Sequence, residues 1–341
     1  MKIGILTGGG DCPGLNPVIR AITRNALNDN HEVIGLRNGW KGLMEKITMP
    51  LNFESVSGIL HRGGTILGTS RTNPYKSENG AQIAKKSFKE LKLNALAAIG
   101  GEDTLGVATK LSDEGLNIIG VPKTIDNDLG ATDFTFGFDT AVNIAMECID
   151  RLHTTAESHN RVMVVEVMGR HAGWIAAYAG VAGGADYILI PELPVDINEV
   201  CASIKRRHQR GKNFSIIVTA EGAALKKEDV VLQEQELDEF GHVRLGGIGQ
   251  TLAKLIEEKT GFETRSTVLG HIQRGGSPSA FDRMLGTRFG AKAYELIKAG
   301  DFGRMVSLKG NEIVGVALKK ATAKLKTLDL ELYEMAKIFF G

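Results

Sequence analysis

The chain has 341 residues, of which 43% are hydrophobic and 24% charged, a composition typical of globular proteins. Its 41 Lys and Arg nearly balance its 40 Asp and Glu, so the formal net charge of +1 gives no indication of a nucleic-acid or membrane-surface partner. At ~100–200 residues per domain, the length predicts about two domains.

The sequence also lacks the usual signs of secretion or membrane insertion. No stretch approaches the ~20 consecutive apolar residues of a membrane span, and the early run "KIGIL" is too short for a signal-peptide core. Cys12, Cys148 and Cys201 are far apart and form no CxxC pair, which disfavours a disulfide framework or a thiolate metal site. We therefore expect a cytoplasmic protein. Cys12 is either a small residue in a crowded turn or a reactive thiol.

Short apolar runs alternate with helical patterns along the chain. The strand-like runs occupy residues 2–6, 32–36, 95–101, 117–121, 161–169, 186–191, 214–222 and 266–270. Amphipathic helices are predicted at residues 15–27, 138–155 and 247–258. Continuous apolar strands that alternate with helices predict an α/β fold. We expect two lobes of mostly parallel sheet, covered by helices on both faces, with the active site in the cleft between them.

We place the boundary between the lobes near residue 138, which divides the chain into 1–137 and 138–341. Whether the C-terminal segment packs back on the first lobe is left open. The most irregular stretch, 225–247, is polar and rich in charge. It is predicted to be a surface loop or a hairpin.

The loops that follow the predicted strands carry most of the chemistry. In open α/β sheets, ligands bind beyond the carboxyl ends of the strands. Six of these loops carry glycine or charged residues: "TGGGDCPGLNP", "GGEDT", "PKTIDND", "MGRHAGW", "EGAA" and "GHIQRGGSP". Glycine lets the backbone approach a ligand closely, and helix N-termini offer amide donors to phosphate. One such loop would be weak evidence, but six favour a phosphate-binding site.

The charged residues of these loops divide by the ligand they suit. A guanidinium fork matches phosphate oxygens, and the candidates are Arg20, Arg71, Arg161, Arg170, Arg265 and Arg274. Carboxylates suit Mg²⁺ or a general base, and the candidates are Glu102, Asp103, Asp126 and Asp128. Together these types indicate phosphoryl transfer. The glycines are not followed by GK[ST], which excludes a P-loop, and "TGGGDCPG" lacks the GxGxxG spacing of a dinucleotide site.

The stretch "VPKTIDND" (121–128) has a simpler alternative reading. Asn and Asp bond their own backbone and tolerate tight conformations, so an Asx-rich turn explains it equally well in isolation.

Five motifs together decide between these readings. They are "GGGDCPGLNPVIR", "GGEDT", "PKTIDND", "EVMGR" and "TVLGHIQRGGSP", which occur in this order. From residue 3 to about 290 the chain resembles the phosphofructokinase family, and in particular its pyrophosphate-dependent members. The resemblance implies Mg²⁺-dependent, reversible phosphorylation of the 1-hydroxyl of fructose 6-phosphate in glycolysis or gluconeogenesis. It also implies that 1–137 binds the phosphoryl donor and 138–341 the sugar phosphate.

The resemblance assigns roles around the reacting hydroxyl. Asp126 is implied as the base, because a sugar hydroxyl is a poor nucleophile that a carboxylate can activate. Thr124 would bond the transferring phosphoryl group or the sugar, and Arg170 would neutralise the charge that develops there. Met168, Gly169 and Arg170 would line the sugar. Asp128 would hold the metal or orient the loop, or it is a turn-capping aspartate.

The same resemblance implies a sugar-phosphate site that two subunits share. His271 and Arg274 would bind the 6-phosphate, and Arg161 and Arg265 would reach in from a neighbouring subunit. Glu221 would accept hydrogen bonds from sugar hydroxyls. We therefore expect a homotetramer or a homodimer.

The amides around Gly10 would bind the phosphates of the phosphoryl donor, and Glu102 would contact Mg²⁺. Two other residues, Asp103 and Lys123, indicate which donor is used. ATP-using relatives carry glycine at the positions of Asp103 and Lys123, which leaves room for the α-phosphate. Here a carboxylate would repel that phosphate, while Lys123 could reach pyrophosphate. We expect pyrophosphate as the donor, with ATP as the alternative.

Two further alternatives are weaker. A non-catalytic sugar-phosphate sensor would not need Asp126, Thr124 and Arg170 together. A lipid or NAD kinase would lack "TIDND" and "GHIQRGG".

The resemblance is weakest at the allosteric site of nucleotide-regulated bacterial relatives, which several Arg and Lys line. Here Arg20 and Arg24 are present, but Phe53, Glu54 and His153 occupy matching regions. We therefore do not expect that regulation.

Overall fold

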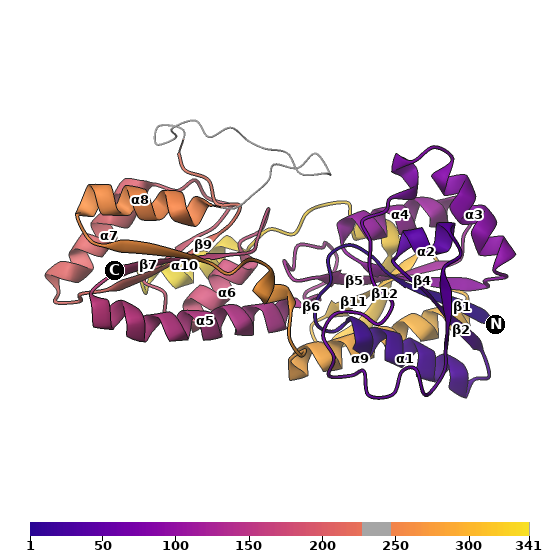
Figure 1. The fold of residues 1–341 in the computed structure, drawn as a ribbon. Coiled ribbons are helices and arrows are strands. Elements are labelled where there is room, and N and C mark those ends of the chain that lie inside the picture. The colour runs from indigo at the N-terminus through magenta and orange to yellow at the C-terminus, as the bar shows by residue number, and fades with distance from the viewer. Residues whose placement is uncertain (227–246, 341) are drawn as a thin grey trace. The chain divides into compact units, whose positions relative to one another are not determined.

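The computed structural model describes residues 1–226 and 247–340 (Figure 1). Most of the stretch 225–247, for which a loop or hairpin was predicted, lies outside the described residues. None of the helices described here is both long enough and apolar enough to cross a membrane.

The chain divides into two compact units. The first contains residues 1–140 and 274–326, and the second contains residues 141–273 and 327–341. The first change of unit, after Thr140, falls close to the predicted boundary at 138. The chain then returns to the first unit with residues 274–326, and its last residues, 327–341, belong to the second unit.

The first unit is built on one mixed sheet. Its order is β12-β11-β5-β4-β1-β2-β3, with β6 paired to β5. The strands are β1 (Lys2–Thr7), β2 (Glu32–Leu36), β3 (Thr48–Leu51), β4 (Ala95–Gly100), β5 (Ile118–Thr124), β6 (Phe136–Gly137), β11 (Arg304–Lys309) and β12 (Glu312–Ala317). The two edge strands β3 and β12 run antiparallel to their neighbours. The strands from β11 through β5, β4 and β1 to β2 are each parallel to the next. The carboxyl ends of β1, β4 and β5 therefore lie next to one another.

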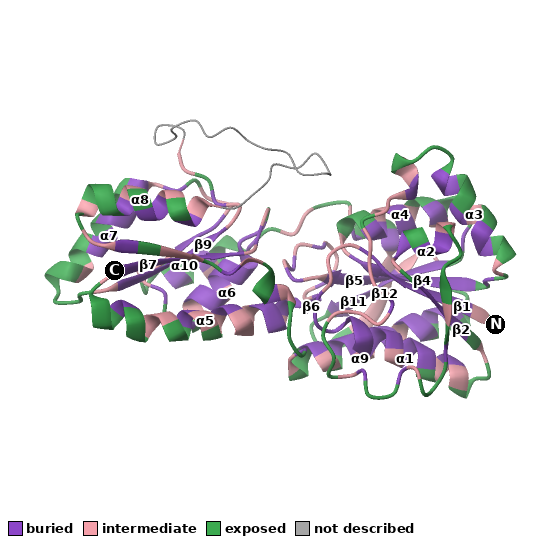
Figure 2. Cartoon of the chain, viewed as in Figure 1, coloured by how far each residue is buried: buried purple, intermediate pink, exposed green. Residues whose placement is uncertain are grey.

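Helices cover both faces of this sheet. They are α1 (Leu15–Asn28), α2 (Trp40–Met44), α3 (Gly80–Glu90), α4 (Glu102–Asp113) and α9 (Ala280–Ala299), with short 3₁₀ turns η1 (Pro74–Lys76) and η4 (Leu318–Lys320). Figure 1 shows α1 and α9 on one face and α2, α3 and α4 on the other. Every residue of β4 is buried, as its unbroken apolar run requires (Figure 2).

The second unit has a smaller, wholly parallel sheet in the order β10-β7-β9-β8. Its strands are β7 (Val162–Val167), β8 (Tyr187–Leu189), β9 (Ser215–Ala220) and β10 (Thr264–Val268). Its helices are α5 (Phe138–His159, which starts in the first unit), α6 (Trp174–Ala182), α7 (Ile197–Gln209), α8 (Ile248–Thr260) and α10 (Leu330–Lys337), and η3 (Gly270–Arg274) follows β10. Val164 and Ile217 of the sheet pack with Val200 of α7 and Leu252 of α8.

The predicted fold class is confirmed: mostly parallel sheets alternate with helices, and the predicted strands are present with ends shifted by a few residues. The hairpin of β11 and β12 was not predicted. Its strand β12 has the largely apolar sequence "EIVGVA" but is only half-buried at the edge of the sheet.

Candidate active site

Three loops of the first unit meet at the carboxyl ends of β1, β4 and β5. The Gly8 amide donates to the Ile99 carbonyl (2.9 Å) and the Gly9 amide to the Ser70 carbonyl (3.1 Å), which hold the glycine loop beside β4. Gly9 has φ +77°, a conformation that favours glycine. The loops "TGGGDCPG", "GGEDT" and "PKTIDND" are therefore brought together, as predicted for strands that end at one edge.

Thr104, in the first turn of α4, explains why two of these glycines have no side chain. A Cβ on Gly8 would lie 2.5 Å from Thr104 Oγ1, and one on Gly100 would lie 2.3 Å from Thr104 Cβ. The sequence analysis did not single out Thr104, although it stands in the "GGEDT" motif.

Lys123 is buried at the end of β5, with only 4% of its surface exposed. Its ammonium donates a hydrogen bond to the carbonyl oxygen of Gly10. Burial lowers its pKa, and Arg274 acts in the same direction, while Cys12, Asp11 and Asp126 oppose the shift. The lysine side chain is thus buried against the glycine loop and is not a solvated surface residue.

The loop after β5 has a tight and specific shape. Asn127 takes the left-handed conformation at φ +51°. Its side-chain oxygen accepts from the Thr135 amide (3.1 Å), and the Thr135 hydroxyl donates to the Thr124 carbonyl (2.8 Å). The Asp126 amide donates to Thr124 Oγ1 (3.1 Å). Asp126 therefore sits on an ordered turn, in which the residue that accepts from the amide two positions on is Thr124 and not an Asn or Asp. The negative charge of Asp126 also opposes the lowering of the Lys123 pKa by burial.

Two carboxylates approach each other beside this turn. Burial raises the pKa of Asp128, and the negative charge of Glu102 adds to the rise; the Thr124 hydroxyl and Lys123 act against it. Glu102 and Asp103 are exposed in the first turn of α4, whose N-cap Gly101 supplies no side-chain cap. Hard oxygen ligands that repel one another suit a divalent cation. No cluster of three His, Cys, Asp or Glu with metal-binding geometry occurs among the residues described.

In the second unit, the loops after β7 and β9 lie side by side. The Gly222 amide donates to the Gly169 carbonyl (3.1 Å) and the Glu221 amide to the Val167 carbonyl (2.8 Å). Gly169 has φ +137°, and a Cβ on Gly222 would lie 2.0 Å from the Arg170 carbonyl oxygen. The structure therefore brings Met168, Gly169, Arg170 and Glu221 together at one edge of the sheet.

A buried glutamine, Gln273, joins the turn that carries His271 to the same loop. Its side-chain oxygen accepts from the Met168 amide (3.2 Å), and its nitrogen donates to the Gly270 carbonyl (3.0 Å). The His271 side chain is exposed. Sequence analysis quoted Gln273 only as part of "GHIQRGG" and assigned it no role.

The next residue, Arg274, belongs to the first unit. Its guanidinium donates to the Asp11 carbonyl (3.3 Å), and a Cβ on Gly10 would lie 2.7 Å from Arg274 Nη1. Arg274 therefore packs directly on the glycine loop.

Arg161 and Arg265 lie at the opposite edge of the second sheet. Arg161 precedes β7, and both arginines pair with Glu263, at 2.8 Å and 2.6 Å. Met168 is seven positions after Arg161 along extended chain, about 23 Å at the usual rise per residue. Within one chain, these two arginines are therefore not beside Met168, Arg170 and Glu221.

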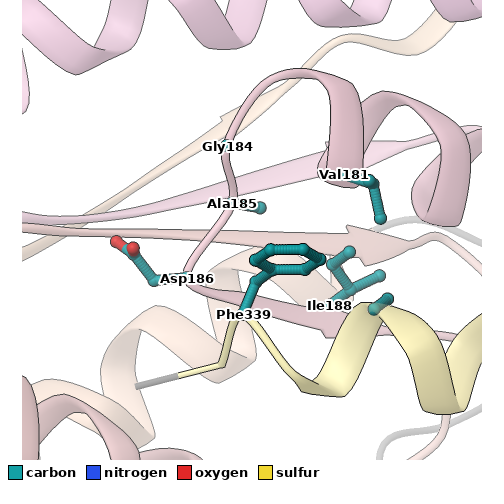
Figure 3. A pocket seen from close by; sticks show the side chains of 7 residues that line it. Val181, Gly184, Ala185, Asp186, Ile188 and Phe339 are labelled. Carbon is teal, nitrogen blue, oxygen red and sulfur yellow. The ribbon is translucent and has the colours of Figure 1, made fainter.

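A cavity of about 170 Å³ also lies at this opposite edge, where Asp186 precedes β8 (Figure 3). Val181, Ile188 and Phe339 line it, and Figure 3 shows the ring of Phe339 directed into it. None of the predicted site residues lines this cavity.

Residues at the positions that form the allosteric site in nucleotide-regulated relatives make internal contacts here. The Arg24 guanidinium lies over the Phe53 ring, 5.4 Å from its centroid. The His153 ring nitrogen Nε2 is 2.7 Å from the Gly183 carbonyl oxygen. Cys12 is fully buried, and burial raises the pKa of its thiol to about 12, which favours the small-residue reading over a reactive thiol.

Strand-end loops that carry glycine, arginine and carboxylates define an α/β protein of phosphoryl-transfer type. Residues 2–297 match the phosphofructokinase family model, and the chain belongs to that family.

Related proteins cover the whole chain. A "pyrophosphate–fructose 6-phosphate 1-phosphotransferase" from Streptomyces coelicolor is 59% identical, over 100% of both chains. An "ATP-dependent 6-phosphofructokinase 3" from the same organism is 52% identical, over 99% of both. A crystal structure of Pichia pastoris phosphofructokinase in the T-state superposes with a TM-score of 0.84 at 30% identity, covering 99% of this chain and 36% of that one.

Proposed function

We propose that the chain transfers a phosphoryl group from inorganic pyrophosphate to the 1-hydroxyl of fructose 6-phosphate. The products are fructose 1,6-bisphosphate and phosphate, and the reaction is reversible. Four relatives named pyrophosphate–fructose 6-phosphate 1-phosphotransferase are 54–59% identical to the chain, and four named as ATP-dependent 6-phosphofructokinases are 50–52% identical. Identity therefore favours pyrophosphate by a small margin, and the residues at the donor loops carry the rest of the argument.

The observation that carries the proposal is the position of Lys123. Its buried ammonium is hydrogen-bonded to the Gly10 carbonyl, in the loop expected to bind the donor's phosphates. A compact cation there suits a small, highly charged donor such as pyrophosphate. It also takes up space that a glycine would leave for a nucleotide.

Asp103 supports the same donor. Its carboxylate is exposed in the first turn of α4, next to the amides of that helix N-terminus. An α-phosphate approaching those amides would meet the negative charge of Asp103. Pyrophosphate has no phosphate beyond the one that leaves, so the carboxylate does not oppose it.

Mg²⁺ fits the carboxylates of the first unit. Glu102 would hold it together with Asp128, whose pKa is raised first by burial and also by the negative charge of Glu102. When bound, the ion would neutralise charge on the phosphoryl oxygens. A pair of carboxylates together with substrate oxygens and water is the usual set for this ion.

Asp126 is assigned as the general base, and Thr124 and Arg170 as ligands of the transferring group. Met168, Gly169, Glu221 and His271 of the second unit, with Arg274, are assigned to the sugar phosphate. The carboxylate of Asp126 would accept the proton of the sugar's 1-hydroxyl while the hydroxyl oxygen attacks one phosphorus of pyrophosphate. The P–O bond from that phosphorus to the leaving phosphate then breaks.

Arg161 and Arg265 are assigned to the 6-phosphate bound by a neighbouring subunit. Arg161 precedes β7 and Arg265 is paired in register with Met163 near the start of that strand, whereas Met168 follows its end. This separation supports a sugar-phosphate site to which two subunits contribute. We therefore propose a homotetramer or homodimer with shared sites. The Glu263 carboxylate, which now pairs with both arginines, would be exchanged for phosphate.

Steady-state assays with each donor test the function. We expect fructose 1,6-bisphosphate formation with pyrophosphate at a kcat/KM well above that with ATP, with no sigmoidal dependence on fructose 6-phosphate and little effect of phosphoenolpyruvate. A clear preference for ATP would overturn the donor and favour the ATP-dependent alternative. A pure protein that binds the sugar phosphate but turns over neither donor would instead be the sensor.

A further inference from the structure

The last segment of the first unit, residues 318–326, runs against the loop that follows Asp126. The Gly130 amide donates to the Ala321 carbonyl (3.2 Å), and the Lys326 amide donates to the Asp128 carbonyl (2.9 Å). A Cβ on Gly130 would lie 2.8 Å from the Lys324 carbonyl oxygen, so the two backbones are in direct contact. This segment is far from Asp126 in sequence but holds the loop that carries it.

The side chain of Lys326 reaches the other arm of the same loop. Its ammonium donates to the Asp133 carbonyl oxygen and lies 5.7 Å from the centroid of the Phe134 ring. The Asp133 carboxylate in turn pairs with Lys309 (3.1 Å). Lys326 thus donates to the Asp128 carbonyl through its backbone amide and to the Asp133 carbonyl through its side chain. It therefore contacts the loop both shortly after Asp126 and just before Phe134.

The contacts of Thr135 close the same loop at its base, with Thr124 and Asn127. The turn at Asp126 is therefore enclosed between two sets of contacts, one from Thr135 and one from Lys326. Of the two, only Lys326 comes from a distant part of the chain.

We infer that Lys326 is a positioning residue for the proposed reaction, which holds the loop so that the Asp126 carboxylate stays at the reacting hydroxyl. This rests on the proposed function. The contacts of Lys326 described above are with the backbone carbonyls of Asp128 and Asp133 and with the Phe134 ring, all on the loop that carries Asp126, so we infer that it acts through that loop. A misplacement of about 1 Å in a catalytic group can cost up to ~10²-fold in rate.

The test compares K326M, which keeps a long flexible side chain but removes the ammonium, with K326R and with the control K324M. Lys324 is an exposed lysine two residues away. We expect K326M to lower kcat with pyrophosphate by about 10- to 100-fold, with each KM within about twofold of wild type. K326R should recover most of the rate, and K324M should match wild type.

A double-mutant cycle separates positioning of the base from general loosening of the structure. If Lys326 acts through Asp126, K326M should change the residual kcat of D126N by less than about threefold, although it lowers wild-type kcat at least tenfold. Hydrogen exchange of amides 124–135 should be faster in K326M than in K324M.

Two results would overturn the inference. One is a K326M enzyme with wild-type kcat, and the other is an equal loss of rate from K326M in the wild-type and D126N backgrounds. A wild-type chain that is inactive with both pyrophosphate and ATP contradicts the proposed function as well. An active wild type with an equally active K326M contradicts this inference alone.

Discussion

The ammonium of Lys123 donates a hydrogen bond to the carbonyl of Gly10, a residue 113 positions earlier in the chain. This bond joins the strand that leads to Asp126 with the glycine loop after β1. Removal of the lysine would therefore change the conformation of the glycine loop as well as the charge beside it.

K123G should therefore lower kcat with pyrophosphate by about 10²-fold or more, the usual cost of losing one preorganised charged donor. Steady-state assays with pyrophosphate and with ATP provide the measurement. D103G serves as the paired variant, and we expect it alone not to restore ATP use, because Lys123 remains. Efficient use of ATP by D103G would show that Lys123 does not exclude the nucleotide.

D126N should lower kcat by ~10²–10⁴-fold while leaving fructose 6-phosphate binding nearly unchanged. The asparagine keeps the shape of the side chain but cannot accept the proton of the 1-hydroxyl. Turnover is compared with the dissociation constant of the sugar phosphate, measured by calorimetry. A D126N enzyme with near-normal turnover would remove Asp126 from the role of base.

Subunit complementation tests the shared site. R161A and D126N should each be nearly inactive as pure oligomers. In a mixed oligomer, one site would combine the intact Asp126 of the R161A chain with the intact Arg161 of the D126N chain. Co-expression of the two variants should therefore recover a substantial fraction of wild-type kcat per intact site.

Two outcomes would argue against that arrangement. A fully active monomer in light scattering would mean that no neighbour is needed. Mixed oligomers as inactive as the pure variants would mean that each chain supplies its own arginines.

Asp282 predicts a pH dependence of stability. Its carboxylate, at the start of α9, accepts from the Thr140 amide (2.8 Å) and hydroxyl (2.5 Å). Burial nevertheless raises its pKa from 3.8 to about 6. Between about pH 4 and pH 6 the folded protein therefore keeps a proton on Asp282 that the unfolded chain has already released. The contribution of this group to the free energy of unfolding falls as the pH rises through that window.

D282N should remove this dependence. From pH 4 to pH 7, the free energy of unfolding of D282N should rise relative to wild type by up to roughly 3 kcal/mol, the equivalent of about two pKa units. Urea unfolding at several pH values provides the measurement. Parallel stability profiles for the two proteins would contradict the raised pKa.

Much of the fold and of the site could be predicted from sequence because the signals are local. Buried parallel strands are continuous apolar runs, so β4 and β7 could be recognised from their own residues. Glycine and charged residues directly after each strand predicted which loops meet, since parallel strands end at one edge. The family resemblance, now confirmed by the match over residues 2–297, supplied the proposed roles of Asp126 and Arg170.

Tertiary structure alone decided the long-range partners. Arg274 with Asp11, Asp282 with Thr140, and Lys326 with Asp133 are separated by 263, 142 and 193 positions. No local pattern encodes such pairs, because a lysine or an aspartate in isolation is compatible with a solvated surface. Only the return of residues 274–326 to the first unit brings these groups together, and it buries Asp282 with Thr140. Burial then makes a hydrogen-bond partner obligatory, and the fold determines which residue is close enough to provide it.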